Sequence, residues 1–255
     1  MSESATYPDL ASRSVLVSGG GSGIGAQIVR RFCGQGSKVA FIDIDRSHSE
    51  ELVAALTGEG LGPPLFLPCD LRDIDALRTC VASAGEANGP ITVLVNNAAR
   101  DDRHPFDTVT PEYWDERFAV NLKHQFFAAQ AVYPMMKRAG GGSVINMGST
   151  SWMVGQGGMA AYTAAKSAVL GLTRSLARDW GGDNIRVNSI APGWIMTERQ
   201  KSMWLTPEGE RELMTRQCLK RQLVPDDIAR VVLFMASDAS SAMTNQSYIV
   251  DGGWV

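Results

Sequence analysis

The sequence predicts a three-layer α/β fold in which helices cover both faces of a seven-stranded parallel sheet. Three observations predict this class. Short β-branched runs alternate with longer amphipathic stretches, the runs are apolar on both faces, and a glycine-rich turn joins the first run to the first stretch. Strands of this kind are typical of a parallel sheet that is buried on both sides. The 255 residues suit one large domain or two small ones.

The expected elements follow one another in a regular order. We expect strands at 14–17, 38–42, 65–69, 91–95, 142–147, 185–190 and 246–250, and helices at 24–33, 47–56, 72–87, 111–138, 158–180 and 225–236. No Pro/Ser-rich linker interrupts this series, so we expect one domain over residues 1–255. The polar, helical stretch 196–220 departs from the pattern. It predicts a small helical substrate lid over about 194–222; the alternative is a surface excursion without a role.

Composition and charge exclude several classes of protein. With 44% apolar and 20% charged residues, the chain is neither disordered nor fibrous. No apolar run is long enough to span a membrane, and the first ten residues lack the pattern of a secretory signal. A net charge of −3 favours no nucleic-acid partner. The four cysteines and three histidines are scattered, so we expect a cytoplasmic protein with free thiols and no metal site.

A glycine-rich turn opens the first expected helix. It reads Ser18-Gly-Gly-Gly-Ser-Gly-Ile-Gly25 and directly follows the first strand. Glycines at 19 and 23 permit positive φ and let the backbone approach a pyrophosphate, while Gly25 lets the helix pack close to the sheet. Any tight turn uses glycine, so the flanking strand and helix carry the prediction. We expect a dinucleotide to bind against Gly19, Ser22, Gly23, Ile24 and Gly25.

The end of the second expected strand predicts which dinucleotide binds. Asp43 lies 18 residues beyond Gly25, where an acidic residue accepts hydrogen bonds from the ribose hydroxyls and repels a 2′-phosphate. Ile44 follows it, and the glycine turn contains no Lys or Arg, so we expect NAD rather than NADP. Arg46 would reach a phosphate only if the loop curled back. The alternative for Asp43 is a solvated strand end.

The third and fourth expected strands also end in candidate cofactor contacts. After the third strand, Asp70 is placed to bond the adenine amino group, and Leu71 to pack on the ring. After the fourth strand, small residues let the backbone lie against the cofactor. These residues are Asn97, Ala98 and Ala99.

Tyr162 and Lys166 form the candidate catalytic pair. They are spaced i, i+4 on an expected helix, so their side chains share a face one turn apart. A phenol has a reference pKa of about 10, and roughly 4 kcal/mol of differential stabilisation would bring it near 7. A nearby ammonium and the positive nicotinamide ring both favour the phenolate. Because this spacing is common on solvated helix faces, it supports a catalytic role only together with two further residues.

Ser149 and Asn121 are those residues. Ser149 lies 13 residues before Tyr162, just past the fifth strand, where its hydroxyl can bond the reacting oxygen. Asn121 lies in the middle of the expected 111–138 helix. A mid-helix Asn can bond a water in place of a helical partner, kink the helix and begin a proton path toward Lys166. The alternative for Asn121 is an ordinary exposed asparagine.

These features together resemble the short-chain dehydrogenase/reductase family. The matches in order and spacing cover essentially the whole chain and are Gly19, Gly23, Gly25, Asn96-Asn97-Ala98, Asn121, Ser149, Tyr162, Lys166 and Pro192-Gly193. The resemblance implies an open Rossmann-type sheet in the order 3-2-1-4-5-6-7, a homotetramer, and a tetrad of Asn121, Ser149, Tyr162 and Lys166. The sequence departs from the family pattern at two positions, where Ser18 replaces the usual Thr and Ala99 the usual Gly. Both changes are conservative, because Ser keeps the hydroxyl and Ala is still small.

The resemblance also extends the cofactor site beyond the glycine turn. It implies that Thr197 bonds the nicotinamide carboxamide, that Lys166 holds the nicotinamide ribose, and that Asn188 is structural. The further residues that it places against the cofactor are Tyr162, Pro192, Gly193 and Ile195.

The loops after the fourth, fifth and sixth strands are expected to form the substrate lip. Carboxylates and amides exchange hydrogen bonds with vicinal hydroxyls, and indoles stack on the C–H face of a pyranose, whereas a steroid or acyl pocket would be mostly aliphatic. The mixture favours a small polyhydroxylated substrate. The alternatives are a solvated turn at 101–104 and a packing role for Trp194. The expected substrate contacts are Asp101, His104, Asn146, Ser149, Trp152, Gln156, Tyr162, Trp194 and Met203.

Five further stretches resemble the bacterial aldose 1-dehydrogenases of this family, which act on D-xylose, L-arabinose or D-galactose. They are residues 97–99, 101–104, 113–117, 206–210 and 217–220. The resemblance implies NAD-dependent oxidation of the C1 hydroxyl of an aldose, D-xylose first, to the aldonolactone. One alternative is an NAD-dependent dehydrogenase or reductase of another polyol, secondary alcohol or ketone. Another is a catalytically silent NAD-binding sensor or scaffold, against which the complete tetrad speaks.

Overall fold

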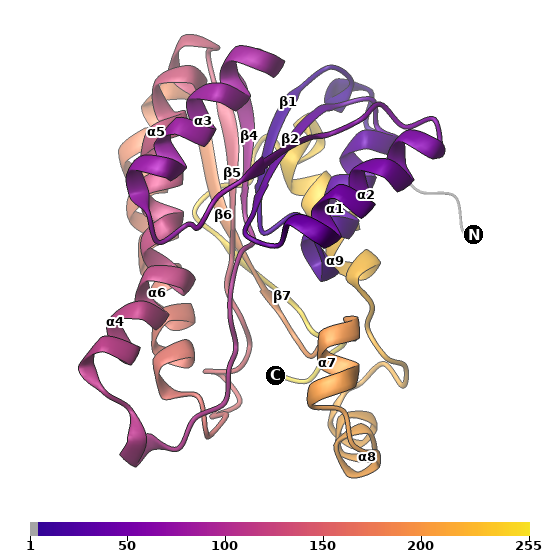
Figure 1. Ribbon diagram of the computed structural model, residues 1–255, viewed down its shortest axis with the longest axis vertical. Helices are drawn as coiled ribbons and strands as arrows, with labels where there is room; N and C mark the ends of the chain where they lie inside the picture. Colours follow the sequence, from indigo (N-terminus) through magenta and orange to yellow (C-terminus); the bar gives the residue numbers. More distant parts are fainter. Residues whose placement is uncertain (1–4) are drawn as a thin grey trace.

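A seven-stranded parallel sheet separates two layers of helices (Figure 1). This computed structural model describes residues 5–255, so the first four residues of the expected domain lie outside the described residues. The sheet order is β3-β2-β1-β4-β5-β6-β7, which confirms the predicted fold class. The strands are β1 (Ser14–Ser18), β2 (Lys38–Asp43), β3 (Leu65–Pro68), β4 (Ile91–Asn96), β5 (Gly142–Met147), β6 (Ile185–Pro192) and β7 (Ser247–Val250).

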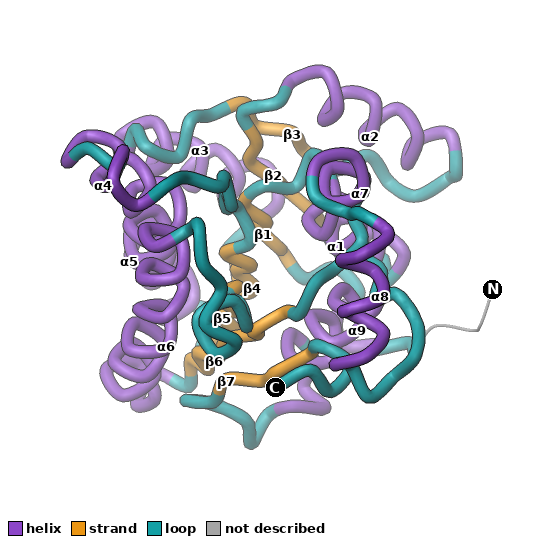
Figure 2. Tube along the Cα trace, turned by 90° about the horizontal axis from the view of Figure 1, so that it is seen from below, coloured by secondary structure: helices purple, strands orange, loops and turns teal. Residues whose placement is uncertain are grey.

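Three long helices cover each face of the sheet (Figure 2). One layer contains α1 (Gly23–Gly34), α2 (Arg46–Gly58) and α9 (Pro225–Ala236). The opposite layer contains α3 (Ile74–Asn88), α5 (His124–Arg138) and α6 (Ala160–Trp180). The chain therefore changes from one face to the other after β3, returns after β6, and joins its parallel strands through helical crossovers.

The core forms on both faces because successive strand residues point to opposite sides. In β1, Val15 and Val17 join the cluster beneath α1 and α9, whereas Leu16 joins the cluster beneath α3 and α5. β4 repeats the pattern with Val93 and Val95 on one side and Leu94 on the other. All of these side chains are buried, which explains why the strands read as unbroken apolar runs.

The expected 111–138 helix is divided by a π-helical turn. The segment comprises α4 (Pro111–Phe118), the π turn Ala119–Lys123 and α5. The Nδ2 of Asn121, inside the turn, donates to the carbonyl oxygen of Arg117 over 2.9 Å. This bond occupies the acceptor that a backbone N–H would use in a regular helix, so the ladder widens there.

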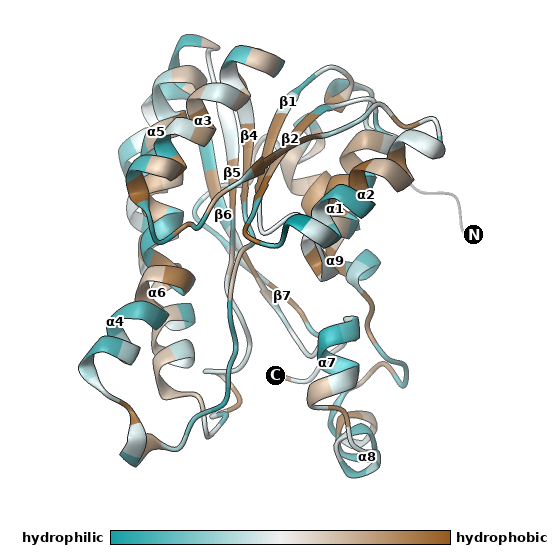
Figure 3. Ribbon diagram, in the orientation of Figure 1, coloured by the Kyte–Doolittle hydropathy of each residue, from teal (hydrophilic) through white to brown (hydrophobic). Residues whose placement is uncertain are grey.

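The polar segment after β6 contains two short helices rather than one. They are α7 (Glu198–Met203) and α8 (Pro207–Arg216), and Figure 3 shows both as largely hydrophilic. Each begins at a threonine N-cap, because Thr197 accepts from the N–H of Gln200 and Thr206 from that of Gly209. The ends of this segment meet, since Ile195 forms a parallel bridge with Leu223. We call residues 194–222 the lid.

The loops that leave the carboxyl ends of the strands gather at one end of the molecule. The lid and α4 hang below that end of the sheet, on opposite sides of it (Figure 1). In open parallel sheets, ligands bind in the crevice outside this edge. Within residues 5–255, no helix combines the length and the apolar character that crossing a membrane requires.

Candidate active site

A cleft of about 1800 Å³ lies at the carboxyl ends of the strands. Its walls come from the glycine turn, the loops after β2 to β6, the first turns of α6 and the lid. Most of the predicted cofactor residues line it, namely Gly19, Ser22, Gly23, Ile24, Gly25, Asp43, Ile44, Asp70, Leu71, Asn97, Ala98, Ala99, Pro192, Gly193, Ile195 and Thr197. The fold therefore brings together cofactor residues from five segments, at the ends of β1, β2, β3, β4 and β6.

The glycine turn leaves no room for side chains. A Cβ on Gly25 would lie 1.8 Å from the carbonyl oxygen of Gly19, and a Cβ on Gly19 would lie 2.7 Å from the Cα of Ala98. Gly19 also has a φ of +66°, which favours glycine. Ser22 caps α1 without a side-chain bond to the helix. The amide end of α1 therefore faces the cleft, where it suits a pyrophosphate.

Asp43 at the end of β2 is fixed beside this turn. Its Oδ2 accepts a hydrogen bond from the N–H of Gly21 over 2.8 Å, and its Oδ1 accepts one from the N–H of Asp45 over 2.9 Å. Ile44, 68% exposed, lies next to it on the cleft wall. Arg46 forms an ion pair with Glu50 instead of turning into the cleft. This arrangement fits the ribose of a dinucleotide without a 2′-phosphate.

Asn97 braces the glycine turn from the end of β4. Its Nδ2 donates to the carbonyl oxygens of Ser18 and Gly19 over 3.2 and 2.8 Å. The hydroxyl of Ser18 in turn accepts from the N–H groups of Asn97 and Ala98. The hydroxyl is therefore the functional part of Ser18, which explains how it serves in place of threonine.

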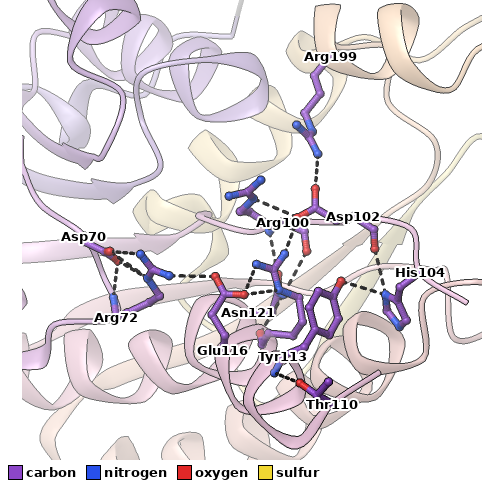
Figure 4. A network of polar contacts seen from close by, with 11 residues as sticks. Asp70, Arg72, Arg100, Asp102, His104, Thr110, Tyr113, Glu116, Asn121 and Arg199 are labelled. Carbon is purple, nitrogen blue, oxygen red and sulfur yellow. Dashed lines mark hydrogen bonds and ion pairs between the residues drawn. The ribbon is translucent and has the colours of Figure 1, made fainter. Parts of the chain in front are cut away.

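The expected adenine contact, Asp70, has a partner within the protein. Arg72 binds both carboxylate oxygens of Asp70 and also reaches Glu116 over 2.9 Å (Figure 4). The guanidinium lowers the pKa of Asp70 below its ordinary value. Asp70 is thus an ionised, oriented acceptor on the cleft wall.

Ser149, Tyr162 and Lys166 meet in the same cleft. Ser149 lies just after β5, and the other two lie one turn apart in α6. The Nζ of Lys166 donates to the carbonyl oxygen of Met147 over 2.8 Å and lies 5.8 Å from the centre of the Tyr162 ring. The side chain of Lys166 is only 2% exposed. A phenol, a hydroxyl and an amine thus share one wall.

Burial perturbs the pKa values of this pair. It raises the pKa of Tyr162 to about 12, an effect that a hydrogen bond with Ser149 opposes and the charge of Asp101 reinforces. Burial also lowers the pKa of Lys166 to about 7, against the charge of Asp101. The direction for Tyr162 is opposite to our expectation, because removal from water outweighs the favourable contacts. A lower value requires a further positive charge beside the phenol.

Asn121 supports the site from behind. It is fully buried, and its side chain exchanges hydrogen bonds with the backbone of Arg100, accepting from the N–H over 2.9 Å and donating to the carbonyl oxygen over 3.1 Å (Figure 4). Its carbonyl oxygen accepts from Gln125. Asn121 thus anchors the loop after β4 and is not an exposed asparagine.

Of the expected substrate contacts, Asp101, Ser149, Gln156, Tyr162 and Trp194 line the cleft. Four others do not. Asn146 is fully buried beneath the sheet, bonded to Asn96 and Thr173, and Met203 points into solvent from α7. Trp152 lines a small separate hollow. The pleat of β5 turns Asn146 away from the cleft and the phase of α7 turns Met203 away, whereas Trp152 lies in the turn after β5 beside the separate hollow, so none of these three assignments holds.

His104 is the fourth correction. Its ring is buried against Tyr113 of α4, with Nδ1 3.0 Å from the phenolic oxygen, and it does not line the cleft (Figure 4). Asp102 also turns toward α4, where it accepts from Arg117 over 2.5 Å. Within this loop, residues 101 and 103 face the cleft while 102 and 104 face α4. Arg103 is a cleft residue that the expected contacts omitted.

The lid closes over the cleft through polar contacts with the same loop. Gln200 donates from Nε2 to Asp101 over 2.7 Å, and its Oε1 accepts from the indole of Trp194 over 2.9 Å. At the lid's start, Thr197 lies against the glycine turn, because a Cβ on Gly23 would be 3.2 Å from its Cγ2. Asn188 bonds the segment before β7, in keeping with a structural role. Residues 5–255 contain no cluster of metal-binding side chains.

Comparisons with known proteins agree with this geometry. A family model described as enoyl-(acyl carrier protein) reductase matches residues 19–255. The chain is 51% identical over 253 residues to a probable galactose dehydrogenase of Rhizobium meliloti, covering 98% of each chain. It is 47% identical over 251 residues to D-xylose 1-dehydrogenase of Caulobacter vibrioides, covering 98% of this chain and 99% of the relative.

A solved structure gives the same result for the fold. A putative short-chain alcohol dehydrogenase from Sinorhizobium meliloti superposes with a TM-score of 0.91 at 33% identity, covering 96% of this chain and 97% of the other. The glycine turn, the Tyr162–Lys166 pair and full-length similarity together show that this chain belongs to the short-chain dehydrogenase/reductase family.

Proposed function

We propose that this protein oxidises the C1 hydroxyl of an aldose to the aldonolactone with NAD⁺. D-Xylose is the first candidate, and L-arabinose and D-galactose follow. The observation that carries the proposal is the meeting of Ser149, Tyr162 and Lys166 with the glycine turn in one cleft. The similarity to the two bacterial sugar dehydrogenases supports a sugar as the substrate.

The cleft walls fit NAD. The α1 amide end would hold the pyrophosphate, and Asp43 would accept hydrogen bonds from the adenosine ribose. Bound NAD⁺ would supply the hydride acceptor for C1 and a positive charge that favours the phenolate of Tyr162. Lys166, Pro192, Gly193, Ile195 and Thr197 line the part of the cleft near Tyr162 where that ring would lie.

Tyr162 acts as the general base on the C1 hydroxyl. Ser149 donates a hydrogen bond to the same oxygen, which fixes the substrate and the phenol together. Because the pKa of Lys166 is about 7, its Nζ can hold or release a proton near neutral pH beside the phenol. Met147 keeps that Nζ in place through its carbonyl oxygen.

The opposite wall suits a polyhydroxylated ring. Asp101 offers a carboxylate, oriented by Gln200, and Trp194 offers an indole edge. A carboxylate accepts hydrogen bonds from sugar hydroxyls and an indole covers the C–H face of a pyranose, whereas a simple ketone or a long acyl chain would use neither contact.

One panel of substrates tests the proposal. Aldoses, polyols and ketones would be offered with NAD⁺ and with NADP⁺, and absorbance of the reduced cofactor measured. We expect turnover with at least one of the three sugars, and a preference for NAD⁺. Turnover of a polyol or ketone alone would redirect the assignment, and NAD⁺ binding without any turnover would indicate a sensor or scaffold.

We also propose that the protein is a homotetramer and is located in the cytoplasm. Light scattering would test the first proposal and cell fractionation the second.

A further inference from the structure

The loop after β4 presents two opposite charges to the cleft. Asp101 and Arg103 line the cleft, while the intervening Asp102 turns away to Arg117. Asp101 is held by Gln200 of the lid. Alternation along this extended stretch therefore places an acceptor and a guanidinium in the cleft that also contains Tyr162.

Arg103 is held in place by uncharged groups. Its guanidinium carbon lies 5.1 Å from the centre of the Trp204 ring, at the end of α7, and its Nη1 lies 3.2 Å from the sulfur of Met159, just before α6. The residue is half-buried. Across residues 5–255, no carboxylate lies within ion-pair distance of it, in contrast to its neighbours Arg100, Arg117 and Arg199.

This arrangement leaves hydrogen-bond donors in the cleft. A guanidinium has five N–H groups in a fixed fork, and the sulfur of Met159 is a weak acceptor for one of them. The indole Nε1 of Trp204, which also lines the cleft, is buried without a partner among the described residues. A rigid cation with free donors, stacked on an aromatic ring beside the catalytic phenol, is suited to bind oxygen atoms of a ligand.

We propose that Arg103 is a specificity-determining residue that donates hydrogen bonds to sugar hydroxyls other than the one at C1. The inference rests on the proposed function. It adds the guanidinium of Arg103 as a hydrogen-bond donor to the sugar, beside the carboxylate of Asp101 as an acceptor. A vicinal diol can donate to the carboxylate of Asp101 and accept from the guanidinium of Arg103. Both side chains would then bond one neutral ring, whereas a carboxylate-bearing sugar would meet the negative charge of Asp101.

The test compares Arg103→Met with Arg103→Lys and with a matched control. Arg211→Met removes a guanidinium from the exposed side of α8, where it pairs with Glu208 outside the cleft lining. For Arg103→Met we expect kcat/KM for the best aldose to fall roughly 10- to 100-fold, because hydrogen bonds from a charged group are lost. KM for NAD⁺ should stay near the wild-type value in both variants. In Arg103→Lys, which keeps the positive charge, the apparent pKa of the kcat profile should also stay near the wild-type value. The control should match wild type throughout.

Deoxy sugars separate hydroxyl binding from a general effect on Tyr162. With 2-, 3- and 4-deoxy analogues, at least one should reduce the penalty of Arg103→Met to below threefold, because the hydroxyl that Arg103 binds is missing. An equal penalty on every analogue, or a uronate turned over faster than the neutral sugar, would overturn the inference. If wild type oxidises an aldose and Arg103→Met does so with the same kcat/KM, the role of Arg103 is overturned and the proposed function is not. A wild-type enzyme inactive on all aldoses would overturn the proposed function as well.

Discussion

Arg199 in the lid donates a hydrogen bond to Asp102 in the loop after β4, over 2.7 Å. Asp102 also accepts from Arg117, whose side chain is almost fully buried. Two guanidinium groups from different sides of the cleft therefore share one carboxylate. This carboxylate connects the position of the lid to α4 (Figure 4).

Replacing Asp102 by Asn should loosen the lid and destabilise the fold. Loss of the charge leaves Arg117 with Glu116 as its ion-pair partner and leaves Arg199 with only the longer contact to Asp101, at 3.5 Å. We expect the free energy of unfolding to fall by about 1–3 kcal/mol, and KM for the sugar to rise more than KM for NAD⁺. Urea unfolding and steady-state kinetics measure these quantities. Glu208→Gln on exposed α8 is the control, and equal behaviour of both variants would contradict the prediction.

Replacing Tyr162 by Phe should remove catalysis without removing cofactor binding. The variant lacks the oxygen that takes the proton, so kcat should fall by roughly 10²–10⁴. NAD⁺ affinity, measured by calorimetry, should change little. Tyr133→Phe serves as the control, because that hydroxyl bonds Asp183 outside the cleft lining. A Tyr162→Phe variant with wild-type turnover would eliminate the phenol as base.

Ser149 and Asp101 should move the pH profile in opposite directions. The hydrogen bond with Ser149 lowers the pKa of Tyr162 and the charge of Asp101 raises it. The acidic limb of kcat against pH, on which activity rises as the phenol loses its proton, should therefore shift to higher pH in Ser149→Ala and to lower pH in Asp101→Asn. Profiles measured at saturating NAD⁺ and sugar report this directly. A shift of both variants in the same direction would rule out this account of the two contacts.

Replacing Asp43 by Ser should reduce the preference for NAD⁺ over NADP⁺. The carboxylate is fixed by Gly21 where a 2′-phosphate would lie, and the hydroxyl removes its repulsion. The ratio of kcat/KM values for the two cofactors should fall by at least about tenfold, equivalent to about 1.4 kcal/mol. Asp75→Ser, on the exposed side of α3 and outside the cleft lining, is the matched control. An unchanged ratio would show that other residues select the cofactor.

His124 should make the fold sensitive to mild acid. Complete burial and the charge of Lys166 lower its pKa to about 3. The unfolded chain takes up this proton near its reference pKa of about 6.5, so stability is lost as pH falls from there toward 3, by up to about 1.4 kcal/mol per pH unit. Urea unfolding between pH 7 and 5 should show a smaller slope in His124→Gln. His48→Gln, exposed on α2, should not reduce the slope.

The fold and the cofactor half of the cleft could be predicted from sequence. Both depend on local signals with a fixed geometry. Apolar runs set the strands, and parallel strands bring their carboxyl ends to one edge, so Gly19, Asp43 and Tyr162 arrive there together. The glycine spacing also has one steric solution, as the contact between Gly25 and Gly19 demonstrates.

The substrate wall was predicted only in part, because side-chain direction in a loop is set by distant partners. His104 turns to Tyr113 and Asp102 to Arg117, and both partners belong to α4. Asn146 sits in a β5 whose pleat directs it inward to Thr173. Arg103 was omitted because nothing near it in the sequence marks which of the loop's charges faces the cleft.

The bridge between Ile195 and Leu223 holds the two ends of the lid together. The N–H of Met196 donates to the carbonyl oxygen of Leu223 over 2.8 Å, so the segment leaves and re-enters the fold at nearly one point. A loop whose ends already touch can change length at low entropic cost. Relatives with this bridge could therefore trade lids as whole units, and substrate range could diversify by grafting without disturbing the sheet.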